Sequence, residues 1–381
     1  MSRVGPAQHD GIGKRVGVLG AGQLGQMLAL AGIPLGVRFT FYSPTPSPSA
    51  EAVGDLVIGA YDDGEALRAF ARSVDVVTYE FENVSAEAVS VIEAECQVWP
   101  PRDALFTSQD RGLEKQCFAR LGIPVASYRL VDSLHDLEAA LRDIGAPGIL
   151  KTRRFGYDGK GQARIATAAD AEAAFVWLGA SGLVYERLIT FERELSIIAV
   201  RAEGGEVRCY PPIQNSHRDG ILRTSVAPAD VCEAKRREAE DHVRSLLSQF
   251  DYVGVLALEM FDTADGLVAN EIAPRVHNSG HWTIEGAETS QFENHVRAVC
   301  GMPLGSCAPV GHSVMVNIIG RHPDANSVLG ISGAHLHLYG KTERAARKLG
   351  HVTVVAADAD GARRAAEELC AIPLVDSGSA A

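Results

Sequence analysis

Short apolar runs alternate with amphipathic stretches along the first part of the chain. Apolar and β-branched residues predict buried strands at Arg15–Leu19, Val37–Tyr42 and Asp75–Tyr79. An amphipathic stretch at Gln26–Ala31 predicts a helix, whereas the prolines of the SPTPSPS segment (43–49) predict irregular chain. Because strands that alternate with helices are typical of a parallel, doubly wound sheet, we expect an α/β unit over roughly the first 105 residues.

The pattern changes after a Trp-Pro-Pro-Arg segment, residues 99–102, which indicates a domain boundary. Helices are predicted near Lys115–Leu121 and Leu134–Ile144, and a strand at Gly148–Lys151 leads into a glycine-rich loop. The stretch Ala163–Ser196 alternates short strands with one helix. We therefore expect a small α+β unit in the middle of the chain.

The rest of the chain predicts a larger unit. It begins with a charged helix at Ala229–Gln249 and a β-hairpin at Val253–Ile272. Three short strands and a last helix are predicted near Val314–Ile318, Leu336–Leu338, Val352–Val355 and Gly361–Cys370.

Length and charge limit the kinds of function that this organisation can serve. The 381 residues suggest two or three domains, and 48 acidic against 36 basic residues give a net charge of −12. Such a chain repels the phosphate backbone, so we expect no nucleic-acid partner. We also expect no membrane association and a cytoplasmic location, because no long apolar run or hydrophobic signal region is found. The seven scattered cysteines fit reduced, buried thiols.

A Gly20-x-Gly22-x-x-Gly25 turn lies between the first predicted strand and helix, where a dinucleotide fingerprint would stand. Its amide groups can approach an anion at the helix N-terminus. An NAD site also needs an acidic residue at the end of the second strand, which here ends in Tyr42-Ser43. We therefore disfavour a nicotinamide cofactor. A structural turn and a site for a smaller phosphate or carboxylate both stay open.

The loop from Lys151 to Gln162 is the densest basic, glycine-bearing stretch of this acidic chain. Glycine amides can surround phosphate oxygens, while lysine and arginine supply positive charge. A solvated basic loop is the alternative, but its position between two predicted strands favours a flexible lid over a polyphosphate.

The predicted hairpin carries the most specific pattern. Glu259 and Glu271 lie symmetrically about a turn at Ala264-Asp265-Gly266, so antiparallel pairing would place them opposite each other among apolar residues. Two such carboxylates repel each other and lose hydration, and a bound Mg²⁺ would remove that conflict. Asn270 could add an oxygen ligand. An exposed face with ordinary glutamates is the alternative.

Two further clusters could bind anions. An arginine, an asparagine and two histidines fall within Arg275–Trp282, directly after the hairpin. The stretch Lys341–Lys348 is locally basic, and it could form either a solvated face or a phosphate clamp.

Together these features resemble the ATP-grasp superfamily. The resemblance becomes close to the N5-carboxyaminoimidazole ribonucleotide synthetases through the strings GQLG, RRFGYDGKGQ, DGILRTSVAP, GVLALEMF and NEIAPRVHNSGHWT. It runs from about residue 14 to about residue 370, and the RVHNSGHWT part separates this family from other carboxylate–amine ligases.

The resemblance implies an ATP-grasp fold that combines α/β and α+β parts. After a flexible N-terminus (1–13) we expect a Rossmann-like preATP-grasp domain at 14–108. The N-terminal part of the grasp with its lid is expected at 109–190, and the C-terminal part with a C-terminal subdomain at 191–381. It also implies the reaction: ATP and bicarbonate give carboxyphosphate, and 5-aminoimidazole ribonucleotide is then carboxylated in purine biosynthesis. The implied assembly is a homodimer.

The resemblance also assigns site residues. Nucleotide contacts would fall on Arg111, Lys151, Gly156, Tyr157, Asp158, Gly159, Lys160, Gly161, Gln162, Glu186, Arg187, Leu188 and Ile189, with Glu194 and His217 at the ribose. Mg²⁺ would lie on Glu259 and Glu271, with Asn270 beside them. Bicarbonate and the amine would meet near Gln23, Glu80, Tyr157, Arg275, His277 and Asn278. The substrate phosphate would be held by Lys341 and by Arg347 or Lys348.

Lys160 departs from the family pattern, which commonly has arginine at this position, and lysine lacks the bidentate fork. Two alternatives remain. One is another ATP-grasp enzyme, such as the formate-dependent glycinamide ribonucleotide transformylase, which should lack RVHNSGHWT. The other is a non-catalytic nucleotide-binding module, which should lack a magnesium carboxylate.

Overall fold

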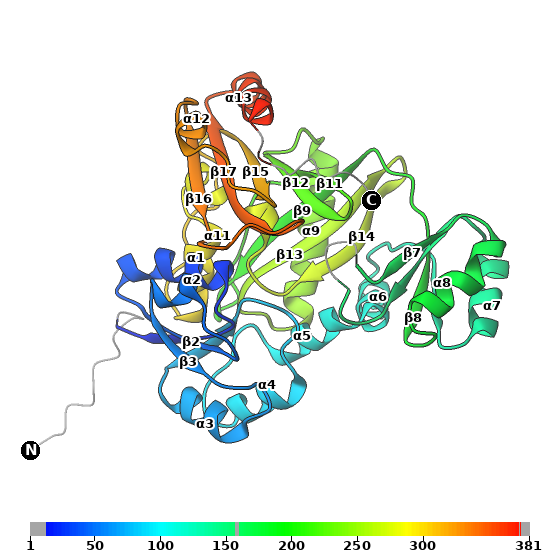
Figure 1. The fold of residues 1–381 in the computed structure, drawn as a ribbon, viewed down its shortest axis with the longest axis horizontal. Helices are drawn as coiled ribbons and strands as arrows, with labels where there is room; N and C mark the ends of the chain where they lie inside the picture. Colours follow the sequence, from blue (N-terminus) through cyan, green and yellow to red (C-terminus); the bar gives the residue numbers. More distant parts are fainter. Residues whose placement is uncertain (1–12, 157–159, 373, 375–381) are drawn as a thin grey trace, which may run out of the picture.

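The computed structural model describes residues 13–156, 160–372 and 374, and Figure 1 shows their arrangement. The chain forms three sheets in sequence order. The first sheet (blue) and the second (green) lie at opposite sides of the view, and the largest sheet lies between and above them.

The first sheet is parallel, with strand order β3-β2-β1-β4, which confirms the expected doubly wound unit. Its strands are β1 (Arg15–Leu19), β2 (Arg38–Ser43), β3 (Asp55–Ile58) and β4 (Val76–Tyr79). Its helices are α1 (Gln23–Gly32), η1 (Ile33–Leu35), α2 (Pro48–Glu51), α3 (Gly64–Arg72) and α4 (Ala86–Glu93). The prediction of irregular chain after β2 is wrong at its end: α2 begins at Pro48, because proline is tolerated in the first turn of a helix.

The second sheet is a small antiparallel unit with order β5-β8-β6-β7. It follows α5 (Arg102–Gln109) and α6 (Arg111–Arg120), which pack beside the hairpin strand β14. The unit contains β5 (Tyr128–Val131), α7 (Leu134–Ile144), β6 (Gly148–Thr152), β7 (Gln162–Ile165), η2 (Ala168–Asp170), α8 (Ala171–Trp177) and β8 (Leu183–Arg187). Apolar residues of α7 and α8 form one core with the sheet, which gives the predicted α+β unit.

The third sheet has nine strands, in the order β14-β13-β9-β11-β12-β15-β17-β16, with β10 beside β9. Its strands are β9 (Arg193–Arg201), β10 (Val207–Cys209), β11 (Ile213–Arg218), β12 (Ile221–Ala227), β13 (Gly254–Thr263), β14 (Gly266–Ala273), β15 (His312–Ile319), β16 (Ala334–Leu338) and β17 (Lys348–Ala356). Its helices are α9 (Glu233–Gln249), η3 (Asn278–Gly280), α10 (Thr283–Gly286), α11 (Gln291–Val299), α12 (Ala325–Leu329) and α13 (Ala359–Ala371).

Packing of α9 orients the hairpin. Its buried residues Ala239, Val243, Leu246 and Leu247 recur at helical spacing and pack on the third sheet. On β13 they meet Leu258 and its apolar neighbours two residues away on either side. Because side chains alternate across a strand, Glu259 must point to the opposite face.

None of the helices in the described ranges has the length and apolarity that crossing a membrane requires. All seven cysteines are free thiols. The prediction of burial is wrong for Cys232 and Cys370, which are exposed.

We predict that Leu246→Ala lowers the free energy of unfolding by about 2–5 kcal/mol, because it leaves a cavity beneath the hairpin. Leu246 is 0% exposed, whereas Leu329, 58% exposed, provides the matched control. Urea unfolding followed by circular dichroism measures both. Equal midpoints for Leu246→Ala and Leu329→Ala would contradict this packing.

Candidate active site

The hairpin brings two glutamates face to face. Glu259 on β13 and Glu271 on β14 are cross-strand partners, as the sequence predicted. The pairing shifts by one residue directly after Glu259, so that Asn270 is the extra residue of a β-bulge. Since a bulge re-aims side chains, Asn270 and Glu271 can serve the same side of the hairpin although they are neighbours.

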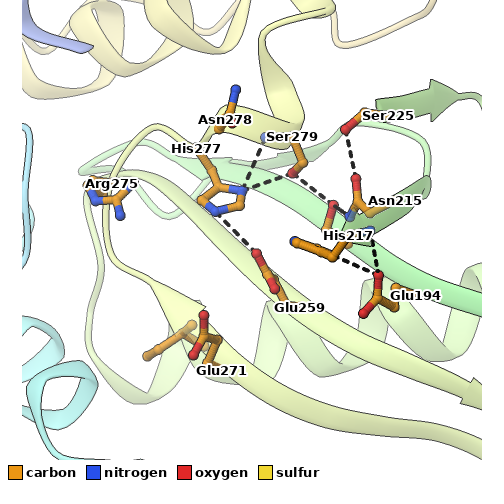
Figure 2. Close-up of polar contacts among 12 residues, drawn as sticks. Glu194, Asn215, His217, Ser225, Glu259, Glu271, Arg275, His277, Asn278 and Ser279 are labelled. Atoms are coloured by element: carbon orange, nitrogen blue, oxygen red, sulfur yellow. Dashed lines mark hydrogen bonds and ion pairs between the residues drawn. The ribbon is translucent and has the colours of Figure 1, made fainter. Parts of the chain in front are cut away.

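Positive and polar groups surround this pair (Figure 2). Arg111 donates from Nη1 to Glu271 Oε2 at 2.9 Å, and His277 Nε2 lies 3.2 Å from Glu259 Oε1. Burial and the charge of Glu271 raise the pKa of Glu259 to about 7. Behind the pair, buried Glu114 accepts the backbone N–H of Ile272 at 2.7 Å. The two carboxylates are thus short of positive charge.

Within the described residues, no group of three or more histidine, cysteine, aspartate or glutamate side chains is arranged to hold a metal ion. A pair of facing carboxylates nevertheless fits Mg²⁺, which is often held by one or two carboxylates together with substrate phosphates and water. Burial and repulsion by Glu271 disfavour the ionised form of Glu259, and a bound cation would offset both.

A second charged cluster lies on the small sheet. Glu186 on β8 accepts a hydrogen bond from Lys151 of β6 at 2.9 Å, and Lys115 of α6 lies 3.3 Å away. Burial opposes the ionised carboxylate, but Lys151 and Lys115 outweigh it and lower the pKa of Glu186 to about 2. Burial lowers the pKa of Lys151. The cluster holds two cations around one carboxylate, a favourable place for an anionic ligand.

On the other side of β13 from β14, the side chain of Glu194 on β9 accepts from His217 of β11 at 2.6 Å. Burial opposes the charged imidazole, but the hydrogen bond to Glu194 and the charge of Glu259 raise the pKa of His217. Glu194 and His217 lie near Glu259 (Figure 2).

The two ends of the basic loop are hydrogen-bonded to each other. Thr152 donates its N–H to the carbonyl of Gly161 at 2.8 Å, and Gln162 pairs with Lys151. A Cβ at Gly161 would lie 2.6 Å from Thr152 Oγ1, and its φ of +72° favours glycine. Gly156 and Lys160 flank the predicted site residues Tyr157, Asp158 and Gly159, which lie outside the described residues.

At the first sheet, the glycine turn holds a carboxylate of the protein itself. Glu80, directly after β4, accepts the backbone N–H groups of Gly22 and of Gly25, the latter at 2.7 Å. Burial raises the pKa of Glu80 against these hydrogen bonds. The amides of the turn at this helix N-terminus therefore bind a carboxylate of the protein itself, whereas the sequence left open a separate phosphate or carboxylate.

A lysine from the far end of the chain reaches the helix that follows the same turn. Lys341 donates to Gln23 Oε1 at 2.5 Å. Burial and the nearby Arg347 lower the pKa of Lys341 to about 8. This contact brings the GQLG segment to the C-terminal basic stretch.

The loop after the hairpin is tightly held. Arg275 forms a bidentate ion pair with Glu82, with distances of 2.5 and 3.0 Å, and a third N–H bonds the carbonyl of Val276. Asn278 exchanges two amide hydrogen bonds with Asn317, at 3.0 and 2.8 Å. Burial, Arg275 and Lys348 lower the pKa of His277 to about 3, so its ring is neutral.

The remaining predicted residues make contacts outside these clusters. Arg187 donates to the carbonyl of Ile144 at the end of α7, and Arg347 bonds Thr342 within its own loop. Leu188 is fixed through its backbone, which donates to Pro147. Ile189 follows it in the connection to β9.

Sequence reasoning missed four residues that support the site: Glu82, Glu114, Lys115 and Asn317. Each acts through a partner far along the chain, such as Glu82 with Arg275, 193 residues apart. Glu114 and Lys115 are buried in α6, which Asp110 caps, and their burial follows from tertiary packing that the sequence does not reveal.

A lysine–glutamate cluster on a small antiparallel sheet, facing a paired-glutamate hairpin on a larger one, defines an ATP-grasp ligase. Sequence profiles agree. The ATP-grasp domain matches residues 116–292, the ribonucleotide synthetase preATP-grasp domain 13–109, and the phosphoribosylaminoimidazole carboxylase C-terminal domain 313–365.

Two relatives are named N5-carboxyaminoimidazole ribonucleotide synthase. That of Pseudomonas aeruginosa is 50% identical over 344 residues, covering 90% of this chain and 95% of the relative. That of Brucella melitensis is 46% identical and covers 90% of this chain and 96% of its own length.

Solved structures extend the likeness. The N5-carboxyaminoimidazole ribonucleotide synthetase of Thermus thermophilus superposes with a TM-score of 0.91 and 48% identity, covering 96% of this chain and all of its own. An Aspergillus clavatus synthase in complex with ADP and 5-aminoimidazole ribonucleotide superposes with a TM-score of 0.89 and 33% identity. The match covers 95% of this chain and 98% of that synthase. The chain belongs to the family of N5-carboxyaminoimidazole ribonucleotide synthases, ATP-dependent carboxylating ligases of purine biosynthesis.

We predict that Glu186→Gln lowers the free energy of unfolding by about 3–5 kcal/mol at pH 7, because two buried lysines lose their counter-charge. The pKa of Glu186 falls from 4.5 to about 2 on folding, so this stabilisation is complete above pH 4.5 and is lost as the pH falls toward 2. Urea unfolding at pH 7 and pH 3 measures the difference. Exposed Glu138 of α7, changed to glutamine, is the control. A pH-independent difference would contradict the assignment.

Proposed function

We propose that this chain makes carboxyphosphate from ATP and bicarbonate and passes its carboxyl group to the amine of 5-aminoimidazole ribonucleotide. ADP and phosphate are the other products. One observation carries the proposal: the hairpin register places Glu259 opposite Glu271, with His277 on one side and Arg111 on the other. An Aspergillus clavatus relative in complex with ADP and this ribonucleotide supports it.

We assign ATP to the space between the small sheet and the hairpin. Lys151 and Arg111 would neutralise its phosphates, and the backbone of the Gly156–Gln162 loop would cover them. Glu194, hydrogen-bonded to His217, would take the ribose. The segment Glu186–Ile189 would contact the base, through its backbone at Leu188 and Ile189.

Glu259 and Glu271 would hold Mg²⁺, with Asn270 as an added oxygen donor. When bound, the cation supplies positive charge to the transferring phosphoryl group. The residues of the chain position the reactants, and phosphoryl transfer depends mainly on such positioning and charge neutralisation.

Bicarbonate would bind beside His277, Asn278 and Arg275. Arginine has five N–H donors, and three of those of Arg275 are engaged, so two remain for an anion. The neutral imidazole of His277 has a single N–H, which would be shared between Glu259 and the bicarbonate. Tyr157 and the loop that carries it would close the site, because carboxyphosphate must be kept from water.

The amine substrate would lie beside the glycine turn of the first sheet. Glu80 and Gln23 would contact its base, and Lys341, with Arg347 or Lys348, would hold its phosphate. The contact of Lys341 with Gln23 would then give way to the phosphate.

We also propose that the protein acts in the cytoplasm and as a homodimer. Its free thiols fit a reducing compartment. Sedimentation at several protein concentrations tests the dimer, and a monomer throughout would contradict it.

The assay of the proposed function is phosphate release from ATP. We predict slow release from ATP alone and strong stimulation when bicarbonate and 5-aminoimidazole ribonucleotide are both present. Formate in place of bicarbonate is the control for a transformylase. Release that does not depend on bicarbonate would overturn the proposal.

Glu271→Gln tests the metal site. We predict a wild-type circular dichroism spectrum and at least a hundredfold loss of Mg²⁺-dependent turnover, about the effect of removing one electrostatic group from a transition state. Glu138→Gln, on the exposed face of α7, is the control. Wild-type kinetics of Glu271→Gln would remove this glutamate from the site.

A further inference from the structure

A chain of buried hydrogen bonds runs from His277 into the interior of the third sheet (Figure 2). Ser279 Oγ lies 2.9 Å from His277 Nδ1 and accepts from Ser196 Oγ at 2.8 Å. Asn215 donates to Ser196 at 2.9 Å and accepts from Ser225 at 2.8 Å. Ser279, Ser196 and Ser225 are 0% exposed and Asn215 is 6% exposed. None of these four residues is among the assigned substrate contacts.

These hydrogen bonds determine which ring nitrogen of His277 carries the proton. The backbone N–H of Ser279 points at His277 Nδ1 at 3.3 Å, and an amide N–H can only donate. Nδ1 is therefore an acceptor, and the proton of the neutral ring lies on Nε2. Nε2 in turn lies 3.2 Å from the Glu259 carboxylate, which needs a donor there.

The hydroxyl of Ser279 reinforces the same state. Because Ser279 Oγ already accepts from Ser196, its own hydrogen is left to donate to His277 Nδ1. That bond, at 2.9 Å, is shorter than the one from the backbone. The ring thus receives its main hydrogen bond from a side chain whose orientation the buried network fixes.

The backbone of His277 is held separately. Gln291 accepts the N–H of His277 at 2.9 Å and donates to its carbonyl at 2.6 Å. Loss of the Ser279 hydroxyl would therefore remove the shorter hydrogen bond at Nδ1, leave the ring only its longer bond from the backbone N–H, and leave the loop in place.

We propose that Ser279, backed by Ser196, is a positioning residue that holds His277 as the Nε2–H tautomer, with this N–H directed at Glu259 and at the bicarbonate beside it. The inference rests on the proposed function for the role of His277. The other tautomer would turn a lone pair toward two anions. Outer hydrogen-bond partners of this kind commonly contribute about ten- to a hundredfold to activity.

The test combines spectroscopy with kinetics. In protein labelled with ¹⁵N-histidine, the His277 ring signals are identified by their absence from His277→Gln. The wild type should show a protonated Nε2 and a hydrogen-bonded Nδ1. In Ser279→Ala the Nδ1 signal should move toward that of a free imidazole nitrogen. We expect kcat to fall about ten- to a hundredfold while KM for ATP stays unchanged.

Ser196→Ala should shift the same signal and lower kcat less, which keeps the test open if Ser279→Ala does not fold. Ser313→Ala is the matched control, because Ser313 is also 0% exposed and its hydroxyl has no hydrogen-bond partner among the described residues. It should behave like the wild type.

A Ser279→Ala protein with an unmoved Nδ1 signal, or with wild-type kcat, would overturn the inference, as would an equal loss in Ser313→Ala. Failure of the proposed function looks different. In that case the wild type itself shows no bicarbonate-dependent phosphate release, and the Nδ1 signal still reports on the positioning.

Discussion

Two carboxylates that face each other across an antiparallel pair of strands set the demands on the rest of this site. At a separation of about 5 Å, and an effective dielectric constant of about 20, two such charges repel by about 3 kcal/mol. Arg111 from α6 pairs with Glu271, and His277 from the loop after β14 contacts Glu259. The pKa of Glu259 is nevertheless raised to about 7. The remaining deficit of positive charge is the reason why we propose that the hairpin binds Mg²⁺ together with phosphate.

The distribution of charge elsewhere follows the same logic. Several arginines of the basic segments form ion pairs with acidic side chains of the protein: Arg153 pairs with Asp132, Arg154 with Asp110, and Arg275 with Glu82. Even the glycine turn of the first sheet is filled by Glu80. Anionic substrates would therefore bind by sharing donors with resident carboxylates, rather than by entering an open basic cleft.

Local patterns allowed much of this to be predicted from the sequence. The hairpin and the Glu259–Glu271 pair were predicted, although the β-bulge that brings Glu271 opposite Glu259 was not, and α7 was predicted at its observed bounds. The polar strand β11 was missed because its sequence, IQNSHR, lacks an apolar alternation. Partners such as Lys115 for Glu186 were out of reach because tertiary packing alone brings them together. The domain boundaries and the residue roles taken from the family stay predictions.

We infer that the facing carboxylates destabilise the fold until a cation joins them. Thermal unfolding at pH 8 of the wild type and of Glu259→Gln, with and without Mg²⁺ and a non-hydrolysable ATP analogue, tests it directly. A raised pKa means that ionised Glu259 weakens the fold at this pH, so without ligands the variant should melt above the wild type. The wild type should gain strongly from Mg²⁺ with the analogue, and the variant little. A variant that melts lower, or that gains as much as the wild type, would contradict the account.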